Sequence, residues 1–337
     1  MEKILVVQTA FLGDAILTLP MIQKLFELFK DSKIDVLAIP STAEIFSASP
    51  YINEVIIYDK KKEKSLSYLF LLSNSLKHKK YSRIYSPHRS FRTSLLVMNT
   101  NVKETYGFSN SSFKYVYKNV IKYMPGHHEI QRNFDLIGFN YRNDEWKIPP
   151  IMKFNQSAKN KVDIFISNLK SNDKFIALAP GSIWNTKIYP LEYFEEVIKY
   201  LSMKSYNVIL IGSEQESTVC KEIASKYNNV ISAAGIFTIL ESIYLLKKTK
   251  LLICNDSAPT HMGLCAEVPV LTLYCSTSPH FGFYPYTNNS FYLSYDNLNC
   301  KPCGIHGKIK CPLKTFECGY KLDPGVVIPK IEEILND

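Results

Sequence analysis

The sequence predicts an α/β protein made of two Rossmann-like domains, each with a parallel sheet. Short apolar runs rich in β-branched residues alternate with stretches of helical periodicity, a pattern typical of parallel sheets. Several of these runs are continuously apolar, as expected for strands that are buried on both faces. The pattern starts again in the second half, and a length of 337 residues suits two domains better than one.

The expected elements form two series. In the first half, strands are expected at 4–8, 34–39, 55–58 and 84–86, and helices near 15–29, 41–48, 65–78 and 91–99. In the second half, strands are expected at 175–179, 208–211, 251–254 and 270–274, and helices near 191–204, 215–227, 238–248 and 258–266. A Pro-Pro pair interrupts the pattern within 146–160, which predicts the boundary between the domains there. We therefore expect a first domain over 1–155, a second over 156–325, and a C-terminal helix over 326–337 that packs back on the first domain.

Composition and charge narrow the possible locations and partners. The sequence has no run of about 18 uncharged apolar residues, so no transmembrane helix is expected. The N-terminus lacks the pattern of a signal peptide, so a cytoplasmic protein is expected. The net charge of +9 lies entirely in residues 1–168, which hold 24 Lys and Arg against 15 Asp and Glu. A basic half attracts nucleic acid, anionic lipid or an acidic substrate, although any single lysine run is more often a solvated surface.

The loops after the strands are the expected places for chemistry, because parallel sheets bind ligands at the carboxyl ends of their strands. In "QTAFLGDAILTLP" (8–20), one glycine does not make a G-x-G-x-x-G dinucleotide site. From the residues alone, a helix cap is the favoured interpretation of Asp14. The alternative is a general base on a substrate hydroxyl, since Asp14 follows the first strand.

Three loops of the second half suggest a nucleotide site. In "APGSIWNTKIYP" (179–190), Gly181 permits an unusual backbone angle, and hydroxyls and a lysine precede a helix that begins at Pro190, which suits a phosphate or diphosphate. In "LIGSEQE" (210–216), Glu214 or Glu216 suits either the helix dipole or ribose hydroxyls. In "NDSAPTH" (255–261), Asp256 and Ser257 are candidate helix caps, and His261 is either an anion ligand or a core histidine.

Taken together, the motifs resemble those of the ADP-heptose:lipopolysaccharide heptosyltransferases, glycosyltransferase family nine. The similar stretches run in the family's order from about residue 2 to residue 325: "ILVVQTAFLGDAILTLP", "YINEVIIYD", "RSFRTSLL" with "ETYGF", "LAPGSIWNTKIYP", "LIGSEQE" and "NDSAPTHMGLCAEVPVLTLY". The resemblance implies the GT-B architecture, in which two Rossmann-like domains face a central cleft. It also implies an inverting transfer that needs no metal.

The resemblance assigns roles to individual residues. Asp14 matches the general base and Lys187 the cation that stabilises the departing ADP, while Gly13 lets the acceptor approach the backbone. Arg89 and Arg92 lie in the acceptor-side segment, where Thr93 stands in place of the family's second serine. The remaining positions match the donor site: Ser182, Thr186, Glu216, Phe237, Asp256, Ser257, Ala258 and His261.

The implied partners are ADP-heptose and a Kdo- or heptose-terminated lipid A core, with no nucleic acid. Such an acceptor carries carboxylates and phosphates and lies at the cytoplasmic face of the inner membrane, so a basic first domain suits peripheral association with that surface.

Four cysteines form a cluster near the C-terminus. Cys300, Cys303, Cys311 and Cys318 have the spacing C-x2-C-x7-C-x6-C, which in a cytoplasmic protein suggests a metal before a disulfide. Zinc is the natural choice, and His306 is a further candidate ligand. Reduced buried thiols and disulfides are the alternatives. A similar segment occurs in part of the family and favours the second-heptose type; Cys220, Cys254, Cys265 and Cys275 are expected to be small buried hydrophobes.

Three other functions are alternatives to a heptosyltransferase. The most similar alternative is a family member that transfers another sugar or modifies a protein acceptor. A nicotinamide dehydrogenase is disfavoured by the missing G-x-G-x-x-G motif. A basic nucleic-acid-binding module leaves the neutral second half unexplained and lacks a recognisable binding motif.

Overall fold

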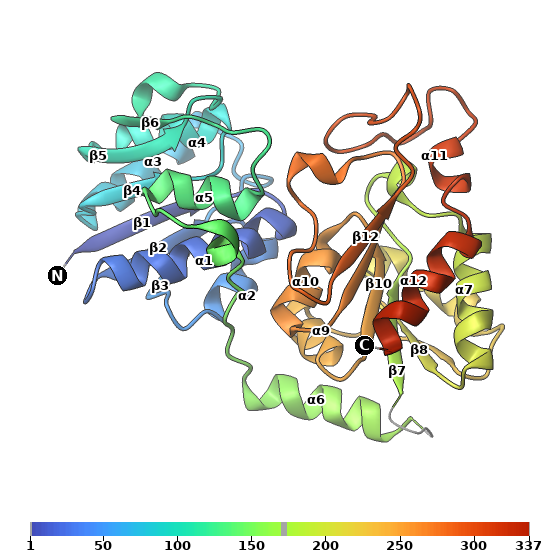
Figure 1. Cartoon of the computed structure of the whole chain (residues 1–337). Helices are drawn as coiled ribbons and strands as arrows, with labels where there is room; N and C mark the ends of the chain where they lie inside the picture. The colour runs from blue at the N-terminus through green and yellow to red at the C-terminus, as the bar shows by residue number, and fades with distance from the viewer. Residues whose placement is uncertain (1, 170–173, 337) are drawn as a thin grey trace. The chain divides into compact units, whose positions relative to one another are not determined.

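The computed structural model describes residues 2–169 and 174–336, and these fold into two compact units that divide between Lys153 and Phe154. Each unit contains a six-stranded, all-parallel sheet covered by helices, as Figure 1 shows. The predicted α/β class with two parallel sheets is therefore confirmed. The units divide two residues before the boundary that the Pro-Pro pair suggested.

The first unit has the strand order β3-β2-β1-β4-β5-β6. Its strands are β1 (Lys3–Gln8), β2 (Lys33–Ala38), β3 (Glu54–Ile57), β4 (Arg83–Ser86), β5 (Glu104–Phe108) and β6 (Asn119–Ile121). Its helices are α1 (Leu12–Leu28), α2 (Pro40–Ser47), α3 (Leu66–His78), α4 (Phe91–Asn99) and α5 (Glu129–Ile137), with 3-10 turns η1 (Lys114–Val116) and η2 (Asn143–Trp146).

The second unit has the order β12-β11-β10-β7-β8-β9. Its strands are β7 (Phe175–Ala179), β8 (Asn207–Leu210), β9 (Val230–Ser232), β10 (Leu251–Asn255), β11 (Val270–Tyr274) and β12 (Phe291–Ser294). Its helices are α6 (Gln156–Ser167), α7 (Leu191–Met203), α8 (Ser217–Ala224), α9 (Ile239–Leu246), α10 (Ala258–Ala266), α11 (Glu317–Tyr320) and α12 (Pro324–Asn336), with 3-10 turns η3 (Asn185–Lys187), η4 (Glu214–Glu216) and η5 (Pro279–Phe281).

The two sheets share one topology, and it fixes where ligands bind. The strand order reverses between β1 and β4 in the first unit and between β7 and β10 in the second. At such a reversal the loops after the two central strands diverge to opposite faces of the sheet and leave room for a ligand at the carboxyl ends of the strands. The loops after β1, β4, β7 and β10 are therefore the places to look for the site.

Helix α12 corrects one expectation. Its side chains Val327, Ile331 and Ile334 are buried in the core of the second unit, and the helix packs on α7. The apolar side of α12 is thus covered within the second unit, whereas the sequence led us to expect it against the first. Residue 337, the predicted end of this segment, lies outside the described residues.

Candidate functional site

Asp14 lies in the first turn of α1, directly after β1, in the first unit. Its pKa is raised to about 7, chiefly because surrounding protein atoms remove water from the carboxylate. The negative charge of Glu129 raises the pKa further, while Arg89 and the backbone N–H groups of Asp14 and Phe11 lower it. The side chain nevertheless keeps partial solvent contact. A carboxyl group that titrates near neutral pH is well suited to accept a proton from a substrate.

The structure bears on both interpretations of Asp14. Phe11 is the N-cap residue of α1, and its own side chain makes no capping hydrogen bond. Asp14 is the third helical residue, where a negative charge still benefits from the helix dipole. Asp14 is therefore not the N-cap residue, although the backbone N–H groups of Phe11 and Asp14 hydrogen-bond to its carboxylate at the start of the helix. Gly13, beside it in the same turn, is half-buried.

The two arginines of the predicted acceptor segment differ in their surroundings. The Arg92 guanidinium donates to the Tyr58 hydroxyl at 2.7 and 3.0 Å and to the backbone carbonyls of Lys64 and Glu63 at 2.7 and 3.2 Å. These bonds make Arg92 a clamp on the 58–65 loop, in contrast to the predicted acceptor-binding role. Arg89 instead stacks on the ring of Tyr123, with the guanidinium carbon 4.5 Å from the ring centroid, so it is the better placed of the two to meet an anion.

Three further residues lie around Asp14, and the sequence analysis did not single them out: Thr9, Lys60 and His88. His88 Nδ1, after β4, lies 2.8 Å from the hydroxyl oxygens of Thr9 and Thr93. Burial, together with Lys60 and Arg89, lowers the pKa of His88 to about 4, so the ring is neutral at physiological pH. Lys60 donates to the Thr9 carbonyl at 2.6 Å, and burial followed by the charge of Arg92 lowers its pKa. The loops after β1 and β4 are thereby tied together around Asp14.

In the second unit, Lys187 and Asp256 form an ion pair of 2.8 Å with both side chains only 12% exposed. The Thr277 hydroxyl donates to Asp256 at 2.6 Å. Asp256 was a candidate helix cap, but its carboxylate is committed to Lys187 and Thr277 instead. The pair holds a lysine ammonium at the end of the β7 loop, where it can stabilise a negatively charged group.

His261, in the second turn of α10, lies close to this pair. Burial lowers its pKa to about 4; the Asp256 charge opposes this shift and the Lys187 charge adds to it. Its buried Nδ1 has no hydrogen-bond partner within the described residues. A neutral imidazole with an unused polar atom fits the predicted role of a residue that binds the donor substrate better than that of a core histidine with all its hydrogen bonds made.

The loop after β7 is fixed by Asn255, which the sequence analysis did not identify. Its buried side-chain oxygen accepts from the Tyr189 N–H at 2.9 Å. Its side-chain nitrogen donates to the carbonyls of Pro180 and Gly181 at 2.8 and 3.2 Å. One amide at the end of β10 therefore holds both ends of the loop that carries Ser182 and Lys187.

The structure gives Thr186 a different role from the predicted one. Its buried hydroxyl donates to the Lys308 carbonyl at 2.9 Å and accepts from the Lys308 N–H at 2.8 Å and the Ser276 hydroxyl at 2.9 Å. No bonding capacity is left for a donor substrate. Thr186 is instead the joint through which the cysteine-rich segment holds the Lys187 loop. Gly307 fits there because a Cβ would come within 3.0 to 3.3 Å of Ser276, Thr186 and Lys187.

We expect Thr186→Val to weaken ADP binding about tenfold, because loss of hydrogen bonds worth roughly 1 kcal/mol each frees the loop that positions Lys187. Calorimetric titration with ADP measures the effect, and Thr186→Ser, which keeps the hydroxyl, is the control. Unchanged ADP affinity in the valine variant would show that the joint does not position the loop.

Glu216 lies against the glycine of the phosphate loop. A Cβ on Gly181 would come within 1.6 Å of Glu216 Oε1, so only glycine allows this approach. Glu216 Oε2 accepts from the N–H and the hydroxyl of Ser213 at 2.6 and 2.7 Å, in a capping box at η4. The acid therefore serves the turn, as one interpretation held, and its half-buried position beside Gly181 also keeps it available to a ribose.

The remaining predicted donor residues are placed as follows. Ser182 is half-buried, and its hydroxyl accepts weakly from the Trp184 N–H at 3.4 Å. Ser257 is the N-cap of α10 but makes no capping side-chain bond, so the Ala258 N–H is left for an anion. Pro259 has no N–H, and the Thr260 N–H donates to the Ser257 carbonyl at 3.1 Å. Phe237 packs edge-on against Phe165 of α6, with ring centroids 5.1 Å apart, and Lys161 lies over its ring. Its ring is thus partly covered by α6.

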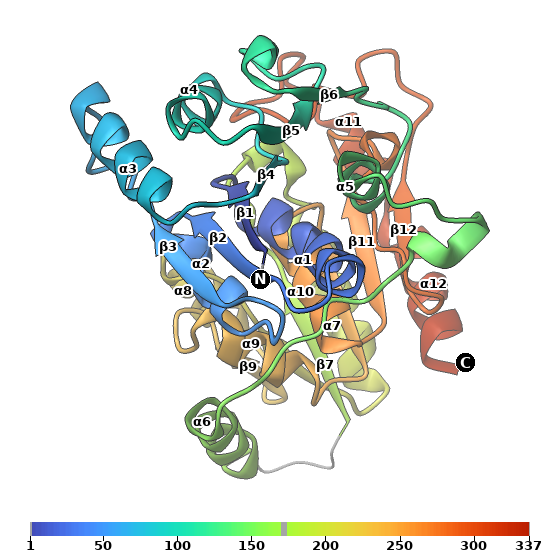
Figure 2. The same ribbon diagram turned by 90° about the vertical axis from the view of Figure 1, so that its left-hand side faces the viewer.

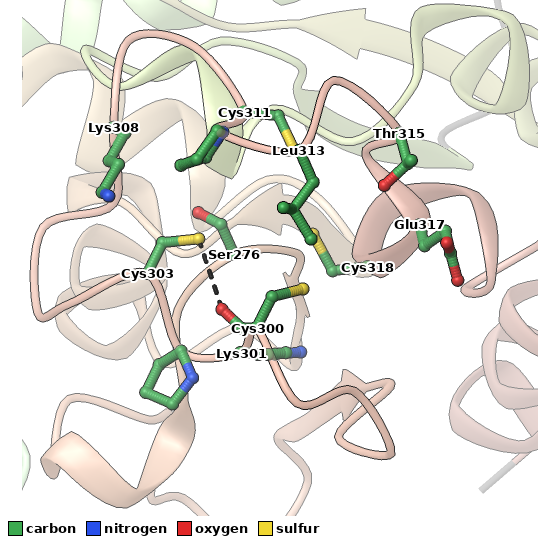
Figure 3. A pocket seen from close by; sticks show the side chains of 12 residues that line it. Ser276, Cys300, Lys301, Cys303, Lys308, Cys311, Leu313, Thr315, Glu317 and Cys318 are labelled. Atoms are coloured by element: carbon green, nitrogen blue, oxygen red, sulfur yellow. Dashed lines mark hydrogen bonds between the residues drawn. The ribbon is translucent and has the colours of Figure 1, made fainter.

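The four clustered cysteines surround one pocket of about 270 Å³, shown in Figure 3. Cys303 and Cys318 have raised pKa values, first through burial. Over the part of the chain that the structure describes, no three His, Cys, Asp or Glu side chains are arranged to hold a metal ion. As placed, the thiols therefore do not fit zinc, and the metal hypothesis stays a prediction. The other four cysteines are buried and free, as expected.

Comparisons with known proteins agree with this architecture. The family model "Glycosyltransferase family 9 (heptosyltransferase)" matches residues 69–314. The chain is 24% identical over 344 residues to lipooligosaccharide heptosyltransferase 2 of Campylobacter jejuni, with 99% of both chains covered. It is 26% identical over 290 residues to lipopolysaccharide heptosyltransferase 3 of Escherichia coli, covering 83% of this chain and 85% of the relative.

Two solved structures share the fold. A family 9 glycosyltransferase from Veillonella parvula superposes with a TM-score of 0.87 at 22% identity, covering 99% of this chain and 97% of the other. E. coli ADP-heptose lps heptosyltransferase II superposes with a TM-score of 0.80 at 20% identity, covering 99% and 98%. The two sheets thus form a GT-B-like fold. The chain belongs to glycosyltransferase family 9, the heptosyltransferase family, and is a glycosyltransferase.

Proposed function

We propose that the protein transfers L-glycero-D-manno-heptose from ADP-heptose to the inner core of lipopolysaccharide, with inversion at the anomeric carbon. The observation that carries this proposal is the pairing of two features within a family 9 chain. The first unit holds a carboxyl group with a pKa of about 7 at the switch point of its sheet. The second holds a nearly buried lysine at the equivalent point of its own sheet.

In the proposed reaction, Asp14 accepts the proton of an acceptor hydroxyl as that oxygen bonds to the anomeric carbon of the heptose. The bond from the anomeric carbon to the diphosphate breaks at the same time, and ADP leaves with its negative charge. Lys187 and the Ala258 N–H at the start of α10 stabilise that charge. Ser182 and His261 contact the diphosphate, and Glu216 the ribose. Arg89 receives an anionic group of the acceptor.

The acceptor type is the finer part of the proposal. The printed names of the relatives include heptosyltransferases 2 and 3, and the cysteine segment favours the second-heptose type. A relative that uses another sugar or a protein acceptor is the alternative. Incubation with ADP-heptose and a panel of Kdo- and heptose-terminated acceptors, followed by mass spectrometry, tests the proposal. A gain of one heptosyl unit on a heptose-terminated acceptor is expected, and no transfer to any member of the panel would refute the proposal.

We also propose that catalysis needs no metal, because Lys187 and the start of α10 supply the positive charge that a metal supplies elsewhere. Chelation with EDTA or phenanthroline is expected to leave turnover unchanged, whatever metal content elemental analysis finds at the cysteine pocket. Loss of turnover on chelation, with recovery on adding zinc, would contradict this prediction.

The acceptor chemistry also suggests a location. A core attached to lipid A lies at a membrane, and we propose that the protein associates peripherally with the cytoplasmic face of the inner membrane. No helix within the described residues is long and apolar enough to cross a bilayer. The excess positive charge of residues 1–168 suits attraction to anionic lipid.

A further inference from the structure

The outer sides of α3, α4 and η1 in the first unit expose a group of large apolar side chains. Six residues, between 42% and 83% exposed, belong to this α3–α4–η1 surface: Leu66, Phe70, Leu71, Phe91, Met98 and Tyr115. Single exposed apolar residues are ordinary, but several on adjoining elements mark an interaction surface.

The three elements that carry these residues are neighbours. Helix α4 packs against both α3 and η1, and Figure 2 shows α3 beside α4 at the margin of the first unit. The Phe91 ring of α4 lies 5.8 Å from that of Phe113, the residue before η1. The inward sides of the same helices are satisfied, since Leu69, Leu76 and Val97 are buried in the core of this unit. The six exposed residues are therefore additional to what the fold needs.

The segment that carries this surface has a strong excess of positive charge. Residues 64–122 contain eleven Lys and Arg residues and a single acidic residue, Glu104. Glu104 accepts hydrogen bonds from Tyr106 and Asn119 on the sheet. At the two ends of α3, Lys64, Lys77 and Lys80 are exposed, and none forms an ion pair with another residue of the described chain. By contrast, Lys79 pairs with Glu54 at 2.6 Å.

We infer that the α3–α4–η1 surface docks the protein on an anionic phospholipid bilayer. The apolar side chains enter the boundary between headgroups and acyl chains, while the lysines at both ends of α3 reach the phosphates. Each lysine near an anionic leaflet adds about 1 kcal/mol of attraction. A group of apolar side chains flanked by lysines complements a bilayer that has anionic headgroups and an apolar interior. This inference rests on the membrane location in the proposed function and names the part of the chain that makes the contact.

Sedimentation with phosphatidylglycerol-rich vesicles tests the inference on the full chain. Wild type is expected to bind these vesicles and to bind pure phosphatidylcholine weakly. The triple variant Leu66→Ser, Phe70→Ser, Leu71→Ser is expected to lower the partition coefficient at least about tenfold, since its insertion surface is lost. Met203→Ser is the matched control, because Met203 is 78% exposed at the end of α7 in the second unit. Equal binding by the triple variant and the control would overturn the inference.

A second variant keeps the test valid if the triple variant folds poorly. Leu71→Trp is expected to show a blue-shifted emission and quenching by brominated lipids when vesicles are added. If the emission of Leu71→Trp did not change upon vesicle binding, insertion at α3 would be overturned. The inference would also be overturned if the protein bound no vesicles and instead bound a protein with an acidic surface. Transfer to a water-soluble, deacylated acceptor measures the proposed function without a membrane. Docking and function can therefore fail separately.

Discussion

Replacement of Asp14 by Asn is expected to lower turnover by about 10² to 10⁴-fold, the usual contribution of a general base. The amide keeps the shape of the carboxyl but cannot accept the proton of the acceptor hydroxyl. ADP affinity should change little, because the residues proposed to hold ADP all belong to the second unit. Steady-state kinetics together with calorimetry of ADP binding separate the two effects.

The stability of the same variant provides an independent check. The folded-state pKa of Asp14 is raised, so folding disfavours the charged carboxylate at pH values above the pKa of the unfolded chain. Asp14→Asn should therefore be at least as stable as wild type at pH 8. Asp31→Asn, at an exposed carboxylate of the same unit, is the control and should leave turnover intact. Turnover of Asp14→Asn within a few-fold of wild type would exclude Asp14 as the base.

Lys187→Met is expected to lower turnover by about 10² to 10³-fold, because no other side chain proposed for the diphosphate carries a full positive charge. The variant also leaves Asp256 without its ion pair, so its carboxylate repels the departing diphosphate. The rate of ADP formation, quantified by chromatography, measures the effect on turnover.

The control for this variant is Lys199→Met, the same substitution at an exposed position on α7. It should retain wild-type turnover and ADP affinity. If Lys187→Met weakened ADP binding but left turnover at saturating donor unchanged, Lys187 would be a binding residue that does not stabilise the transition state.

The fold was largely predictable because it depends on local patterns. Continuous apolar runs marked most central strands, and Phe175–Ala179 and Val270–Tyr274 have the predicted bounds. The missed strands lie at the sheet edges or next to them: β5, β6, β9 and β12. Most residues of β6, β9 and β12 are half-exposed, and β5 contains both buried and half-exposed residues, so these runs are short or mixed in polarity and do not stand out.

The site was predicted less completely, because several of its contacts join distant segments. Asp14, Lys187 and Asp256 follow strands, and their roles were predicted from the resemblance to the family. Position alone left Asp14 and Asp256 as candidate helix caps. Asn255 and Thr277 act through side-chain bonds to other loops, and a single amide or hydroxyl has no sequence signal. The Thr186 joint to Lys308 spans 122 residues and depends on the path of the cysteine-rich segment. His88, beside the recognised Arg89, did have a positional signal, since it closely follows β4.

The dependence of kcat/KM on pH tests the role of Asp14 most directly, because this quantity reports the ionisation of the free enzyme. With a pKa of about 7, the carboxyl is protonated at lower pH and becomes a base as the pH rises. The account predicts that kcat/KM rises about tenfold per pH unit below 7 and levels off above it, and that Asp14→Asn loses this inflection. A wild-type profile that is flat from pH 5 to 8, or an unchanged inflection in Asp14→Asn, would contradict it.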